Sequence, residues 1–337
     1  MRGIRLSIKL LALIVLSVLL MALASSLLPT CTPQKPTPQF KLRIGFFPVQ
    51  DYLPFLVMQE NGFDKQNGLQ FGETSYAGGA AIIDAMAAGL LDVGYVGSVP
   101  VLTAAERGLM PDKIVVVAAN NFADPDHPGL GLLVSTSVRG WKDLNGQHIA
   151  VIAINSLHGA AIKARLQQEN VRNYKLVEIP FANMGLAVVG GNVAAATMSQ
   201  PFLTQSLLRG DGKLLGWIIG GPPFERMEFS MIVFRANYYQ NNHQAIKAFL
   251  RAHLQAVKWM KQNEKEARSI LVKRLKLSQE VGQKVTLLRW PLDARNDPAL
   301  LESMQSVLMK IGMLKASIPV RQLYNETLLE EVLKEKR

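Results

Sequence analysis

From Lys41 onward, short apolar runs alternate with stretches in which apolar residues recur every three or four positions. The runs predict buried strands and the stretches predict helices. An alternation of this kind is typical of an α/β fold with mostly parallel sheets. Residues 120–128, which include two prolines, are predicted as a loop. The predicted strands are residues 42–47, 69–74, 92–95, 114–119, 129–134, 148–153, 175–179, 193–198, 214–218 and 228–234.

Helices are predicted between the strands, and beyond Tyr239 the 3.6-residue repeat indicates a helical C-terminal tail. The chain is too long for one ordinary core and suits two domains. We therefore expect two α/β lobes with a ligand cleft between them, joined by crossings near residues 134–138 and 231–236. The expected lobes are 41–134 plus 236–337 (lobe 1) and 135–235 (lobe 2). The expected helices between strands are 53–60, 78–88, 99–107, 159–168, 183–189 and 202–208.

Residues 1–30 have the pattern of a secretory signal peptide. Arg2, Arg5 and Lys9 precede an apolar stretch that is followed by small residues. An uncleaved membrane anchor is the alternative, because residues 10–28 are long enough to span a bilayer. Either interpretation places the rest of the chain outside the cytoplasm, in the periplasm or on the outer face of the cytoplasmic membrane.

Cys31 is the only cysteine of the chain, so it has no partner for an internal disulfide. Residues 31–40 are rich in proline and predict a stiff, extended tether. We expect lipidation of Cys31, which would hold the protein at the membrane surface. Leu27-Leu-Pro-Thr30 resembles a lipobox poorly, however, and Ala22-Leu-Ala24 offers an ordinary cleavage site instead. Both routes stay open at this point.

The formal net charge is +11, from 37 basic and 26 acidic residues. The basic residues are scattered without an arginine-rich run, which favours a solvated surface over a nucleic-acid partner. The chain contains no G-x-S-x-G, H-E-x-x-H or P-loop motif. His158 has no second candidate ligand nearby in the sequence. We therefore expect no enzyme activity, no catalytic residue, no cofactor and no metal.

Four segments, in the same order, resemble the nitrate/sulfonate/taurine-binding and thiamine-precursor-binding family of ABC transporter substrate-binding proteins. They span roughly residues 41–275. The segments are Lys41-Leu-Arg-Ile-Gly45 with Gln59-Glu-Asn-Gly-Phe63 and Asn67-Gly-Leu69, Ala87-Ala-Gly-Leu-Leu-Asp-Val-Gly-Tyr-Val-Gly-Ser-Val-Pro100, Trp141-Lys-Asp-Leu-Asn-Gly-Gln-His-Ile-Ala-Val151, and Ala248-Phe-Leu-Arg-Ala252 with Ala256-Val-Lys-Trp-Met260.

This resemblance implies a type II periplasmic-binding-protein fold whose two lobes close on a solute. It also implies an ABC permease and an ATPase as partners, and we expect a monomer. Gly191-Asn-Val-Ala-Ala195 departs from the family pattern, which usually has Asp-Ala here. The missing carboxylate argues against an amine-bearing solute. Pyrimidine-precursor synthases share the scaffold but use a cysteine-rich segment, which this chain lacks.

Ligands of parallel α/β sheets bind beyond the carboxyl ends of the strands. Five predicted loops lie at such ends and carry the candidate ligand-binding residues. Each has a structural alternative: the glycines could serve turns, Asp51 and Ser98 could cap helices, Tyr52 could be a core aromatic, and His158 could lie exposed on the surface. The candidates are Gln50, Asp51, Tyr52, Gly78, Gly79, Gly97, Ser98, Asn155, Ser156, His158, Gly159, Ser199 and Gln200.

The chemistry of these loops leaves two classes of solute open. Helix N-termini behind glycines suit a small anion such as a sulfonate, taurine or nitrate. A heterocycle such as a thiamine pyrimidine would instead stack on an aromatic ring such as that of Tyr52. We expect the anion. A ligand-sensing module that feeds a receptor is a further alternative to the importer subunit.

Overall fold

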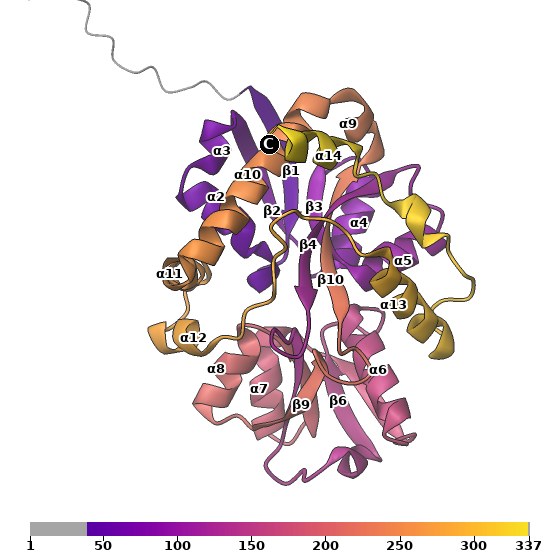
Figure 1. Cartoon of the computed structure of the whole chain (residues 1–337). Helices are drawn as coiled ribbons and strands as arrows, with labels where there is room; N and C mark the ends of the chain where they lie inside the picture. Colours follow the sequence, from indigo (N-terminus) through magenta and orange to yellow (C-terminus); the bar gives the residue numbers. More distant parts are fainter. Residues whose placement is uncertain (1–38, 336–337) are drawn as a thin grey trace, which may run out of the picture. The chain divides into compact units, whose positions relative to one another are not determined.

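A computed structural model describes residues 39–335, which contain two five-stranded mixed sheets (Figure 1). The predicted signal peptide and Cys31 lie outside the described residues, whereas Phe40 already begins a strand. In the first sheet all neighbours are parallel except one strand, β10, which is antiparallel to both of its neighbours. The strand order is β2 (Leu69–Ser75), β1 (Phe40–Phe46), β3 (Val93–Gly97), β10 (Met227–Arg235) and β4 (Ile114–Ala123).

The second sheet repeats this topology. Its fourth strand, β5, is antiparallel to both neighbours, whereas the other pairings are parallel. Each sheet therefore takes its one antiparallel strand from a part of the chain that lies outside its own βα series. The order is β7 (Tyr174–Glu178), β6 (Gln147–Val151), β8 (Ala195–Ser199), β5 (Leu130–Val134) and β9 (Lys213–Ile219).

The chain changes sheets at positions that differ from the predicted crossings. It passes from β4 to β5 through residues 124–129 and returns from β9 to β10 through residues 220–226. The predicted crossings at 134–138 and 231–236 are wrong, because β5 already belongs to the second sheet from Leu130 and β10 already belongs to the first sheet from Met227. The turn-forming residues Asp124-Pro-Asp-His-Pro-Gly129 and Gly220-Gly-Pro-Pro223 mark the true crossings.

Helices cover both faces of the first sheet, as Figure 1 shows. Alternate residues of β4 enter different cores: Val115 and Val117 lie in one buried cluster and Val116 in the other. One face is covered by α2 (Leu53–Glu60), α3 (Phe63–Gln66), α10 (His243–Gln262), α11 (Glu264–Leu275) and α14 (Thr327–Lys334), and the other by α4 (Gly79–Ala87), α5 (Ser98–Glu106) and α13 (Pro298–Lys310).

The second sheet is covered in the same way, by α6 on one face and α7 with α8 on the other. Val49, which follows β1 of the first sheet, is buried within the core of α7 and α8. The remaining bounds are α6 (Leu157–Gln168), α7 (Phe181–Val189), α8 (Phe202–Arg209), α9 (Ala236–Asn241), α12 (Gln279–Lys284), and the short 3₁₀ helices η1 (Gln50–Tyr52), η2 (Trp141–Leu144) and η3 (Val320–Leu323).

The C-terminal tail is helical only in part, which corrects the prediction. Residues 285–297 are mostly extended, and Arg289 and Phe122 exchange two backbone hydrogen bonds of 2.8 and 3.0 Å. Pro291 and Pro298 explain the interruption, because a proline disfavours the helical conformation of the residue before it. Within residues 39–335, none of the helices combines the length and apolar character needed to cross a bilayer.

Candidate functional site

The loops that follow β1 and β8 meet, so strand ends from the two sheets are in contact. The backbone N–H of Gln50 donates to the carbonyl oxygen of Gln200 over 3.4 Å. Both side chains are buried, and the carbonyl oxygen of each side chain accepts a hydrogen bond. Gln200 Oε1 accepts from the Thr204 hydroxyl at 2.8 Å, and Gln50 Oε1 accepts from the Leu288 N–H at 3.1 Å. The extended tail segment therefore helps to position the β1 loop.

A polar cluster lies beside this contact, at the ends of strands of the first sheet. We call Gln50, Asp51, Ser98, Asn120, Asn121 and Ser230 the polar cluster. Ser230 lies opposite Gly97 on β3 and opposite Asn121 on β4. The Asn120 amide donates to Ser230 Oγ and to the Asp51 carbonyl, each at 2.9 Å. The Ser230 hydroxyl donates to Asn121 Oδ1 at 3.0 Å.

Four buried atoms of the polar cluster have no hydrogen-bond partner among the described residues. They are Gln50 Nε2, Ser98 Oγ, Asn120 Oδ1 and Asn121 Nδ2. A buried polar group without a partner costs roughly 1–3 kcal/mol, so such groups tend to mark a site completed by a ligand. Two of the four are amide nitrogens and one is a hydroxyl. The cluster is therefore rich in donors and suits a solute with several oxygen acceptors.

Two helices begin next to each other here, and both starts lack a side-chain cap. These are α4, which begins at Gly79, and α5, which begins at Ser98. A Cβ on Gly79 would come within 3.0 Å of Pro100 in the first turn of α5, whereas a Cβ on Gly78 would meet no atom within 4 Å. The free N–H groups and positive dipole ends of two helices therefore lie together beside open space, which favours an anion.

The electrostatics of the polar cluster are set by one ionisable group. Burial raises the pKa of the Asp51 carboxyl to about 7, partly offset by the neighbouring Ser230 hydroxyl. The other members are neutral amides and hydroxyls, and no lysine or arginine belongs to the cluster. A negative solute would therefore be held by neutral dipoles, and it would favour the protonated form of Asp51.

The second sheet contributes His158, for which exposure on the surface was the structural alternative to a binding role. His158 is buried, not exposed. Its Nε2 lies 3.0 Å from Ser199 Oγ, and its Nδ1 lies 3.2 Å from the Thr197 carbonyl oxygen. Its ring packs 4.9 Å from that of Phe181, measured between centroids. Burial lowers the pKa of His158 to about 4, so the ring is neutral at pH 7.

Three other second-sheet candidates serve the start of α6. Ser156 is its N-cap: the hydroxyl accepts from the Gly159 N–H at 3.4 Å and donates to the Ala153 carbonyl at 2.6 Å. A Cβ on Gly159 would lie 2.0 Å from the carbonyl oxygen of Ile154, so only glycine fits there. Asn155 is exposed in the preceding turn. The structure thus gives Ser156 and Gly159 local structural roles.

Tyr52 belongs to the core, which is the alternative that the sequence left open. Its ring is 2% exposed and packs edge-on against Tyr95, with centroids 4.9 Å apart. Its hydroxyl donates to the Gly45 carbonyl of β1. The side chain of Tyr52 is therefore held within the core of the first sheet, and these contacts give it a structural role.

Sequence reasoning missed Asn120, Asn121 and Ser230. The predicted loop at 120–128 is in fact the end of β4 as far as Ala123, where both asparagines are fully buried. The available signal was a pair of asparagines directly after the apolar run 114–119, and a serine inside the apolar run 229–234. Buried polar residues within apolar strands are informative because burying them carries a penalty.

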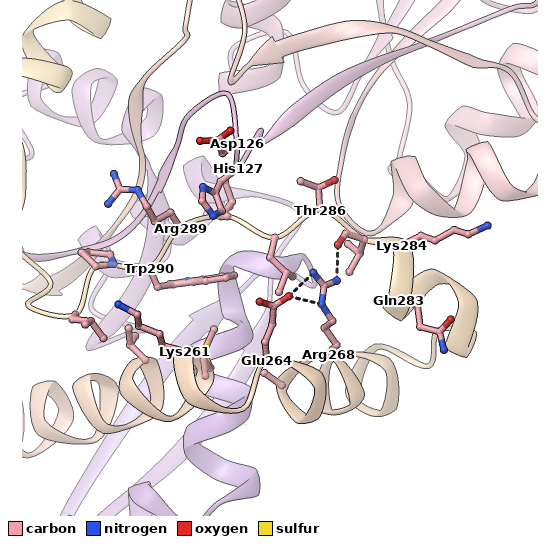
Figure 2. Close-up of a pocket in the computed structure, with 18 of the residues that line it drawn as sticks. Asp126, His127, Lys261, Glu264, Arg268, Gln283, Lys284, Thr286, Arg289 and Trp290 are labelled. Atoms are coloured by element: carbon pink, nitrogen blue, oxygen red, sulfur yellow. Dashed lines mark hydrogen bonds and ion pairs between the residues drawn. The ribbon is translucent and has the colours of Figure 1, made fainter.

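A pocket of about 960 Å³ lies between the α10–α11 region and the extended segment after α12. Its lining includes Leu288, whose N–H donates to Gln50 of the polar cluster. Figure 2 shows Trp290 and Arg289 of this segment on one side and Arg268 paired with Glu264 on the other. None of the predicted ligand-binding residues lines it. Its lining mixes both signs of charge and so indicates no single class of ligand.

Comparison with known proteins identifies the fold. The chain has the fold of periplasmic binding proteins, as its likeness to three solved structures shows. These are the periplasmic nitrate-binding protein NrtA from Synechocystis PCC 6803 (17% identity, 89% of this chain and 90% of that one, TM-score 0.74), the periplasmic aliphatic sulphonate binding protein SsuA from Escherichia coli (18%, 85% and 92%, 0.67), and desulfurization enzyme DSZB (16%, 89% and 100%, 0.64).

A family model of the NMT1-like family matches residues 35–276, which is more than half of the chain. The protein belongs to this family. No curated protein matches the chain in sequence. The predicted fold class and the predicted family are thereby confirmed.

Proposed function

We propose that the protein is the extracytoplasmic solute-binding component of an ABC importer, and that its solute is a small oxyanion of the sulfonate or nitrate kind. One observation carries the choice of solute: the uncapped starts of α4 and α5 meet beside the fully buried, unpartnered hydroxyl of Ser98. Backbone N–H groups at two helix ends provide donors and positive potential without a buried cation.

The donor excess of the polar cluster supports an oxyanion over a cationic solute. Gln50 Nε2, Asn121 Nδ2 and the Ser98 hydroxyl are donors that await acceptors. A sulfonate or nitrate offers three oxygens around one centre, which can accept from donors on several sides. A cation would find only the Asp51 carboxyl and the Asn120 oxygen. The names of the nitrate- and sulphonate-binding structural neighbours agree with this choice.

Two lobes that close on the solute are part of the proposal, together with an ABC permease and ATPase as partners. We place the boundaries at residues 124–129 and 220–226, where the chain changes sheets. The contact between Gln50 and Gln200 supports closure, because it joins strand-end loops of both sheets. A monomer, lipidation of Cys31 and attachment to the membrane stay predictions from the sequence.

A binding role fits the described residues better than an enzymatic one, although one structural neighbour is a desulfurization enzyme. Ser199 and His158 form an arrangement that resembles a nucleophile with its base. Burial lowers the pKa of His158 to about 4, however, which makes it a weak base at pH 7. We therefore assign this pair to the packing of the second sheet against Phe181.

Ser98→Ala tests the proposal. The hydroxyl lacks a partner in the empty protein, so its removal should leave the melting temperature unchanged or raise it. The same change should weaken the best binder among nitrate, taurine and alkanesulfonates by about tenfold, as expected for a lost hydrogen bond to a charged group of about 1.5 kcal/mol. Isothermal calorimetry and thermal unfolding measure the two effects.

Ser156→Ala is the matched control. Loss of this N-cap should lower the stability by about 1 kcal/mol without changing the affinity. Unchanged affinity in Ser98→Ala would remove the α5 start from the site. Binding of pyrimidines alone, with no oxyanion bound, would replace the proposed solute by a heterocycle while keeping the solute-binding role.

A further inference from the structure

We propose a second anion site, separate from the polar cluster, that binds a compact polyanion carrying at least two negative charges. It is a pocket of about 420 Å³ where α6, the start of β7 and the end of α13 come together. Its polar lining consists of Lys163 and Gln167 of α6, Arg172 of the loop before β7, Tyr174 at the start of β7, and Lys310 of α13.

The charge of this pocket is of one sign. Lys163, Arg172 and Lys310 line it together, and its lining contains no acidic side chain. None of the three forms an ion pair or a side-chain hydrogen bond within residues 39–335. Arg165 on the same helix shows the contrast, because it pairs with Glu169 at 2.8 Å. Three unpaired cations around one small volume repel one another, and a bound anion would relieve that repulsion.

Helix dipoles account for only one of these cations. Lys310 is in the last turn of α13, where a positive side chain offsets the negative helix end. Lys163 lies in the middle of α6, and Arg172 follows the helix by several residues. Neither of the two has a local structural reason for its charge. Gln167 and the Tyr174 hydroxyl add neutral donors to the same pocket.

The position of the pocket connects it to both sheets. Lys163 and Arg172 belong to elements of the second sheet, whereas Lys310 belongs to α13, which packs on the first. A polyanion bound to all three would join the two halves. If the halves move, the polyanion and the solute should each raise the affinity of the other, because linkage between two binding sites is reciprocal.

The test is calorimetry of the purified full chain with pyrophosphate. We expect one saturable site. The affinity for pyrophosphate should fall about tenfold in each of the single variants Lys163→Gln and Arg172→Gln. Binding should be lost in the first triple variant, which combines these two changes with Lys310→Gln. A matched triple variant, Lys65→Gln with Lys258→Gln and Lys265→Gln, removes three exposed, unpaired charges elsewhere. It should retain the wild-type affinity. Equal weakening in both triple variants, or retention of affinity in the first, overturns the proposal.

Two further arms locate the ligand and its source. Ser98→Ala should leave pyrophosphate binding intact, and a loss of binding in this variant would place pyrophosphate in the polar cluster and overturn the proposal. Vesicles of phosphatidylcholine with phosphatidic acid distinguish a lipid headgroup from a soluble polyanion. If the wild type binds these vesicles but not pyrophosphate, and the first triple variant loses vesicle binding, the site is assigned to the headgroup phosphate.

Discussion

At the residue scale, the chemistry of the polar cluster depends on Asp51. It is the one ionisable member among neutral amides and hydroxyls, and burial raises its pKa to about 7. A neutral carboxylic acid can donate a hydrogen bond to an oxyanion, whereas a carboxylate repels it. The protonation of this one side chain should therefore control the affinity for an anionic solute near neutral pH.

We predict that oxyanion affinity falls as the pH rises above about 7, by up to about tenfold per pH unit, because binding then requires uptake of one proton. Below pH 7 the affinity should be nearly constant. Asp51→Asn should bind equally well from pH 6 to 9, and more tightly than the wild type at pH 8. Calorimetry across this range measures both, with Asp126→Asn, an exposed carboxyl, as the control. A flat wild-type profile would place Asp51 outside the site.

At the scale of elements, two glycine-flanked helix starts differ in what they do. The start of α4 is uncapped and has open space beside Gly78, whereas the start of α6 is capped by Ser156 and has none beside Gly159. Both patterns look alike in sequence, since each is a glycine-containing loop before a helix. The difference supports the proposed ligand site at the start of α4 and gives the start of α6 a structural role.

We predict opposite outcomes for alanine at these two glycines. Gly159→Ala should lower the unfolding free energy by about 1–3 kcal/mol, because the added Cβ would collide with the Ile154 backbone. Gly78→Ala should change the stability by less than about 0.5 kcal/mol, since its backbone is extended and the space is open. The solute affinity of Gly78→Ala should nevertheless fall about tenfold. Chemical denaturation and calorimetry separate the two effects, and destabilisation by Gly78→Ala would contradict the assignment.

At the scale of the whole molecule, the C-terminal tail contacts β4 and β10, the two strands of the first sheet that adjoin the crossings between the sheets. The segment around Arg289 pairs with β4, and the N–H of Asp297 and the hydroxyl of Tyr324 donate to the Glu228 carboxyl on β10, at 3.2 and 3.4 Å. Burial raises the pKa of Glu228 to about 8. The folded protein therefore holds a proton on Glu228 at pH values where the unfolded chain has lost it.

This predicts that the unfolding free energy decreases as the pH rises from about 4.5 to 8. The folded state binds more protons than the unfolded state in this window, so the slope is negative, at up to about 1.4 kcal/mol per pH unit for this group. Glu228→Gln keeps the acceptor oxygen and should remove this part of the slope, so that it exceeds the wild type in stability at pH 8. Urea unfolding at several pH values tests this, and exposed Glu266→Gln should retain the wild-type slope. An unchanged slope in Glu228→Gln would contradict the prediction.

The sequence by itself determined the elements and the fold class. Apolar periodicity located the strands from β1 to β10 to within a few residues, because a strand buried on both faces must be apolar along its whole length. The βα alternation and the family resemblance then predicted the two-lobed architecture. The contact of Gln50 with Gln200 agrees with the expectation that strand-end loops converge.

Tertiary structure decided which sheet receives each strand and which polar residues face one another. β5 follows β4 in the chain but pairs in the second sheet, and β10 follows β9 but pairs in the first. These assignments depend on pairing with strands elsewhere in the chain and leave no local pattern. The roles of Ser98, Ser156 and His158 could not be told apart from the sequence. Ser156 and His158 have hydrogen-bond partners and the Ser98 hydroxyl has none among the described residues. The local sequence around a hydroxyl or an imidazole is the same in either case. Hydrogen-bond partners are a property of the folded neighbourhood, and only the folded chain specifies them.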